Sequence, residues 1–183
     1  MIINQTAPPA EAPSGDFLKL PAFPKSDTLV LTVVAFSFNP KAEFKRKDDT
    51  GNEYTEVRPG LDFFFGTMVG GKSYFCKPWT VAYSLHEKAN YARWYEAATG
   101  QKAAPGTNPS DMLGKFILGA VKVENKTGKK GTAYTISKLT TVSAVPSILA
   151  NTGTPLEALL PELNKILAGD GDAGKPAGSG NPY

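Results

Sequence analysis

The sequence is poor in the side chains that most catalytic and metal centres use. It has one cysteine, Cys76, and one histidine, His86. A lone cysteine excludes an intramolecular disulfide and is typical of a reducing, cytoplasmic setting. One histidine and one cysteine are too few for a zinc site, and no sequence context supports a Ser-His-Asp triad. No carboxylate cluster suits a metal-dependent nuclease either. We therefore expect no enzyme activity, no cofactor and no metal.

Long hydrophobic runs are also missing. None approaches the ~20 apolar residues that a membrane-spanning helix needs. The opening stretch, MIINQTAPPAEAPSGD, has neither the basic nor the apolar segment of a signal peptide. We expect a cytoplasmic protein without a membrane partner.

What is present is a globular composition that is rich in turn-forming residues. Of 183 residues, 41% are apolar and 20% charged, with 18 glycines and 15 prolines. These proportions indicate a folded domain with many turns. Periodicity divides the chain into a flexible N-terminal arm over 1–25, a barrel over 26–146, and an amphipathic helix with a flexible tail over 147–183.

Five segments read as strands. Thr28–Phe38 is β-branched and apolar on both faces, which predicts a buried strand. Leu61–Met68 alternates, with Leu61, Phe63 and Phe65 on the face opposite Asp62 and Phe64. Three further strands are predicted over 74–83, 116–123 and 132–142, and the polar segment Asn39–Pro59 is expected to be a loop with a turn at Asp49–Asn52.

Two helices complete the pattern. Ser84 and Glu87 match a capping box, which predicts a helix from there to Thr99, ended by Gly100. Pro155–Leu167 reads as a second, leucine-rich helix with a kink or break at Pro161. The expected fold is mainly β with one or two helices. The order β-β-β-α-β-β is that of a five-stranded OB-like β-barrel, here with an added C-terminal helix.

Two motifs support this assignment. Residues 84–88 read S-L-H-E-K and precede a helix with Trp94 and Gly100; some thirty residues later come L-G-K at 113–115 and a Lys/Gly hairpin. Over residues 74–146 the chain resembles small proteins encoded among replication and recombination genes of tailed bacteriophages. That family is generally taken to be OB-like single-stranded-DNA-binding proteins. The resemblance implies sequence-independent binding of single-stranded DNA, in the host cytoplasm if a phage encodes the chain. The chain departs from the family at Ala89 and in its 147–183 extension.

The charge is unevenly distributed. The net charge is only +3, but residues 111–138 hold six lysines against two acids, whereas 41–58 balance five basic and five acidic residues. Lysines that follow phosphates and aromatic rings that stack on bases are what a single-strand-binding surface needs. In an OB barrel both lie on strands two and three and on the loops between strands one–two and four–five. The candidate binding residues are Lys41, Phe44, Lys45, Arg46, Lys47, Tyr54, Phe64, Lys72, Tyr74, Lys77, Trp79, Tyr83, Lys122, Lys126, Lys129 and Lys130.

Other interpretations stay open at this point. The lysines can simply keep an exposed hairpin soluble, and most aromatic residues of a small β protein are core. Trp94 is expected under the barrel, and Cys76 is expected to be a small buried residue. The alternative function is a protein-interaction or virion structural β-barrel module. The sequence leaves open a homo-oligomer, and replication proteins as partners of the C-terminal region.

Overall fold

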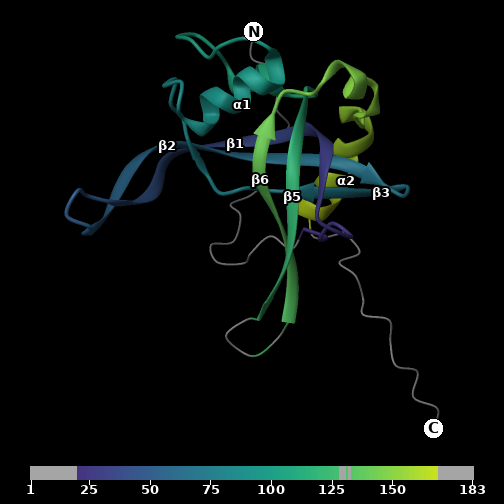
Figure 1. Cartoon of the computed structure of the whole chain (residues 1–183), viewed down its shortest axis with the longest axis horizontal. Coiled ribbons are helices and arrows are strands. Elements are labelled where there is room, and N and C mark those ends of the chain that lie inside the picture. Colours follow the sequence, from purple (N-terminus) through teal and green to yellow (C-terminus); the bar gives the residue numbers. More distant parts are fainter. Residues whose placement is uncertain (1–19, 128–130, 132, 169–183) are drawn as a thin grey trace.

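The computed structural model describes residues 20–127, 131 and 133–168, and it confirms a mainly β, OB-like fold with added helices (Figure 1). One antiparallel sheet runs in the order β3-β2-β1-β5-β6, and β4 pairs with β2. In chain order the elements are β1 (Asp27–Lys47), β2 (Glu53–Val69), β3 (Lys72–Cys76), β4 (Val81–Ala82), α1 (Asn90–Thr99), η1 (Pro109–Met112), β5 (Phe116–Thr127), β6 (Ala133–Ser143), η2 (Ser147–Thr152) and α2 (Leu156–Leu167).

Strand β1 lies in the middle of the sheet, between β2 and β5. Its first part, Asp27–Thr32, pairs with β5, and from Thr32 onward it pairs with β2. Register shifts between Val33 and Ala35 and between Asn39 and Ala42 let this long strand bend between its two neighbours. Strand β3 lies beside β6 without a hydrogen-bonded ladder, so the sheet is nearly closed.

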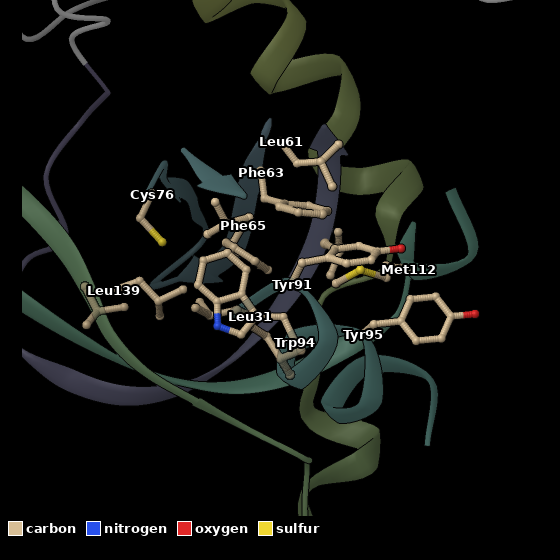
Figure 2. Packing of buried hydrophobic residues seen from close by; sticks show 14 of the residues in the cluster. Leu31, Leu61, Phe63, Phe65, Cys76, Tyr91, Trp94, Tyr95, Met112 and Leu139 are labelled. Atoms are coloured by element: carbon tan, nitrogen blue, oxygen red, sulfur yellow. The ribbon is translucent and has the colours of Figure 1, made fainter. Parts of the chain in front are cut away.

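The inner face of the sheet and helix α1 form the main core (Figure 2). Leu61, Phe63 and Phe65 of β2 are fully buried and point inward, as the alternation predicts. Trp94 of α1 packs edge-on against Phe63 and Phe65, with ring centroids 6.0 and 5.6 Å apart. Cys76 is 1% exposed, and burial raises the pKa of its thiol to about 12. The predictions for Trp94 and Cys76 are both confirmed.

The segment before β1 fills the gap between β3 and β6. Phe23 is 2% exposed, its ring lies 5.5 Å from that of Tyr74 on β3, and its amide donates to Ser137 Oγ on β6. Leu20 packs on the opposite side of the sheet. Phe23 therefore completes the barrel wall from within the segment that the sequence assigned to the arm.

The predicted loop over 39–59 is wrong. Strand β1 continues to Lys47 and β2 begins at Glu53, so only Asp48–Asn52 turns. Asp48 supports that turn, because its carboxylate accepts hydrogen bonds from the amides of Thr50 and Asn52 and from the Thr50 hydroxyl. These bonds lower the pKa of Asp48. The polar side chains face solvent on both sides of a two-stranded ribbon, and polarity alone does not distinguish such a ribbon from a loop.

The capping-box prediction is also wrong. Helix α1 begins at Asn90 after Ala89, which offers no capping side chain, and Ser84 accepts only a long bond from the His86 amide, 3.4 Å. Residues 84–88 form a turn in which His86 Nδ1 accepts from the Lys88 amide. Gly100 ends the helix with φ +73°, as expected.

Helix α2 covers the outer face of the sheet beside β1 to β3 (Figure 1). Leu159 and Leu163 are fully buried against Val34 and Phe75. The helix runs without a break across Pro161, so the break that the sequence allowed at this residue does not occur. Just before it, the Thr154 carbonyl accepts from the Thr32 hydroxyl, and its own hydroxyl accepts from the Met68 amide, 3.0 Å. These bonds attach the segment before α2 to the sheet near Thr32, where β1 changes its pairing partner from β5 to β2.

Candidate nucleic-acid interface

Two ribbons extend from the barrel, and they carry most of the predicted binding residues. We call residues 41–58 of the first two strands the β1–β2 arm and residues 122–138 of the last two strands the β5–β6 arm. Figure 1 shows the two arms leaving the barrel in different directions. Lys129 and Lys130 lie outside the described residues.

Three of the five basic residues of the β1–β2 arm are paired within it. Arg46 contacts Glu56 at 3.2 Å and Lys47 contacts Glu53 at 3.4 Å. Arg58 contacts the same Glu56 at 3.6 Å. Such exposed pairs contribute little stability and exchange readily for other partners. Two further cations of the arm, Lys41 and Lys45, are exposed and form no ion pair with a described residue.

Phe44 is positioned by its own arm rather than left free. The Arg58 guanidinium lies 5.0 Å from the centroid of the Phe44 ring, a cation–π contact. The ring is half-buried, and its tip faces Gly60 at the root of the arm. Arg58 Nε is buried without a hydrogen-bond partner among the described residues. Phe44 therefore holds Arg58 in place more than it offers a stacking surface.

In the β5–β6 arm, one carboxylate holds three lysines. Glu124 accepts from Lys138 at 2.8 Å and from Lys122 and Lys126 at 3.3 Å each. Hydrogen bonds from these three ammonium groups lower the pKa of Glu124 to about 2. This Glu124 cluster offsets part of the positive charge that the sequence places in the hairpin.

Each arm presents a tyrosine directly across from a basic residue. Tyr54 pairs with Arg46 in the β1–β2 arm and is 51% exposed. Tyr134 pairs with Lys126 in the β5–β6 arm and is 49% exposed. Directly opposed residues share one face of a ribbon, so ring and cation lie side by side. Sequence reasoning missed Tyr134 as a site residue; the signal available was its place opposite Lys126 across the predicted hairpin.

The groove predicted across strands two and three is largely covered. Phe64 points outward from β2 and is half-buried against the leucines of α2. Phe75 of β3 packs against the same leucines and is fully buried. Tyr74 points inward and packs on Phe23. Phe64 and Tyr74 are therefore not free stacking surfaces in this conformation.

Trp79 and Tyr83 do not share one strand, contrary to the predicted strand over 74–83. The segment 77–80 between β3 and β4 is irregular, and in it Trp79 is 62% exposed. Beside it Asp62 accepts from Thr80 Oγ1 at 2.6 Å and from Lys77 at 3.2 Å. Lys72 is exposed at the start of β3. The structure leaves Trp79 as the most exposed aromatic side chain among the described residues.

Among the described residues, no three His, Cys, Asp or Glu side chains gather in a way that could hold a metal ion. In the same part of the chain, no helix has the length and apolarity to cross a membrane. No protein-family model, curated protein or solved structure matches the chain.

Proposed function

We propose that this protein is a non-enzymatic single-stranded-DNA-binding protein of a phage-type replication or recombination system, with little sequence preference. The observation that carries the proposal is the pair of arms. OB barrels bind oligonucleotides with the loops between strands one–two and four–five. In this chain both connections are long ribbons, and each carries a half-exposed tyrosine opposite a basic residue, Tyr54 with Arg46 and Tyr134 with Lys126.

The packing of α2 favours a particular path for the strand. Leu159 and Leu163 occupy the middle of the outer sheet face, which other OB barrels leave open to nucleic acid. The proposed path therefore follows the arms, with Trp79 as a further stacking residue near the β1–β2 arm. Tyrosine and tryptophan stack on any base, since every base has a π-face, and this accounts for weak sequence preference.

The cations available to phosphates differ between the arms. Lys41 and Lys45 can contact phosphates directly, because no described carboxylate holds them. The three lysines around Glu124 must first break their ion pairs with that carboxylate before they can contact phosphate; they are Lys122, Lys126 and Lys138. Such exchange lowers affinity without abolishing it, because exposed ion pairs are weak in water. We expect moderate affinity at physiological salt with a clear salt dependence.

Fluorescence anisotropy with a labelled oligothymidylate and a duplex of equal length tests the proposal. We expect tighter binding of the single strand, with log affinity falling by about 0.7 per phosphate contact for each tenfold rise in salt. A Lys41→Glu/Lys45→Glu variant should bind the single strand more weakly. A Lys165→Glu variant, changed at an exposed position of α2, should keep the wild-type affinity. Absence of binding at low salt would refute the proposal.

One observation favours the alternative, a protein-interaction or virion structural module. Ile148 of η2 is 87% exposed, and Leu160 and Leu167 of α2 are more than one-third exposed. Sedimentation of the wild type beside an Ile148→Glu variant tests it. On this interpretation the wild type sediments as an assembly and the Ile148→Glu variant sediments as a smaller species. A wild-type monomer would remove the homo-oligomer version of the alternative.

A further inference from the structure

A cleft lies at the root of the β1–β2 arm, on the side of the sheet away from α2. It encloses about 330 Å³ between the end of the barrel and the loop before η1. Phe36, Phe38 and Leu61 line one side, and Tyr83, Thr107 and Asn108 line the other. None of the described lining residues is a carboxylate.

The two aromatic rings at the mouth are exposed and fixed in orientation. Phe38 is 55% exposed and Tyr83 is 37% exposed. Their rings meet edge to face at 89°, with centroids 6.3 Å apart. The Tyr83 hydroxyl donates to the Thr107 carbonyl at 3.2 Å, and its amide donates to the Pro59 carbonyl at 3.0 Å. An exposed phenylalanine backed by a tethered tyrosine offers a rigid π-surface.

The wall that Tyr83 forms is backed by a buried tyrosine that does not itself line the cleft. Tyr91 of α1 is fully buried beneath Tyr83, with ring centroids 5.0 Å apart. Its hydroxyl has no hydrogen-bond partner among the described residues. The contact between the two rings holds Tyr83 in place beside Phe38.

The charge beside the cleft suits a phosphate backbone. Three residues beyond Phe38 comes Lys41, followed on the arm by Glu43 and Lys45. The pairs Phe38–Leu61 and Lys45–Thr55 lie on one face of the ribbon, about 20 Å apart along β2 at the usual rise per residue. Neither lysine is in an ion pair with a described residue, and the short stretch is net positive.

We propose that this cleft binds one unpaired nucleobase of the DNA strand, stacked on Phe38. The inference rests on the proposed function and adds a binding site to it. The base stacks on the Phe38 ring beside Tyr83, and its polar edge faces the side chain of Asn108. The phosphates on one side of that nucleotide run along the arm past Lys41.

Alanine substitution with a matched control tests the site. Phe38→Ala should weaken binding of oligothymidylate by about 5-fold to about 150-fold, the range of base–aromatic stacking. Met68→Ala removes another exposed apolar side chain, 45% exposed, from the far end of β2 and should leave affinity unchanged. Phe38→Trp keeps a stacking ring and should restore binding.

An abasic oligonucleotide of the same length separates base from phosphate contacts. It keeps the charge but has no base, so wild type and Phe38→Ala should bind it equally. If wild type binds oligothymidylate and Phe38→Ala binds it as well as Met68→Ala does, the cleft is not a base site, although the proposed function stands. An equal loss on the abasic strand would also overturn the proposal. Only failure of the wild type to bind would count against the function itself.

Discussion

Replacing Glu124 by glutamine should strengthen single-strand binding. In the β5–β6 arm this one carboxylate accepts from Lys122, Lys126 and Lys138 at 2.8–3.3 Å. Glutamine has nearly the same shape but no charge, so it releases the three ammonium groups and raises the net charge by one. Those groups lie on the face of the ribbon that also carries Tyr134.

The magnitude follows from counterion release. Each extra phosphate contact steepens the salt dependence by about 0.7 and adds about fivefold in affinity at ~0.1 M salt relative to ~1 M. One to three released lysines therefore predict a gain of about 5-fold to about 100-fold at low salt, which vanishes at high salt. Acid should not imitate the substitution at mildly acidic pH. The pKa of Glu124 is about 2 against an ordinary 4.5, so its pairing is complete above 4.5 and is lost only as pH falls through about 2.

Anisotropy titrations at several salt concentrations measure both the affinity and its slope. Glu162→Gln is the matched control, because Glu162 makes the same kind of exposed pair with Lys165 on α2 and the charge change is identical. Equal effects of the two substitutions would mean that only net charge matters. No effect of either would show that the β5–β6 arm does not contact phosphate.

Three further predictions follow from the structure. Tyr54→Ala and Tyr134→Ala should each weaken single-strand binding by about 5-fold to about 150-fold in anisotropy titrations, with unchanged urea midpoints because both rings are about half exposed. Leu163→Ala should lower the free energy of unfolding in urea by about 2–5 kcal/mol, since the side chain is fully buried; a change near zero would mean that α2 is not docked. Cys76 should resist thiol reagents until the protein unfolds, because its thiol is buried and its pKa is raised to about 12; rapid labelling of the native protein would contradict the core packing.

Local sequence patterns predicted the barrel well where one face of a strand is buried. Leu61, Phe63 and Phe65 alternate with Asp62 and Phe64, and the structure places the two sets on opposite faces. The same reasoning failed over 39–59, where both faces of the ribbon meet water and no apolar alternation is needed. It failed again at Ser84, because turn and helix-cap conformations offer the same serine similar hydrogen bonds.

The candidate binding surface depends on contacts that no local pattern contains. Phe64 and Trp79 are both aromatic residues near the predicted groove, yet α2 covers the first and leaves the second 62% exposed. Phe38 stands out only once the cleft is known, and the strand register confirms that Tyr134 lies opposite Lys126. Glu124 looked like one acid among many lysines, until cross-strand pairing brought three of them to it.

By itself the sequence determined the class of fold and the order of its main elements. Apolar periodicity and the conformational preferences of glycine and proline act over a few residues. Their effects can therefore be recognised from the sequence without knowledge of the fold. Only the tertiary structure decided that Phe23 closes the barrel, that α2 covers the outer sheet face, and which aromatic rings meet solvent. Burial and charge pairing depend on residues far apart in the chain, and folding alone brings those residues together.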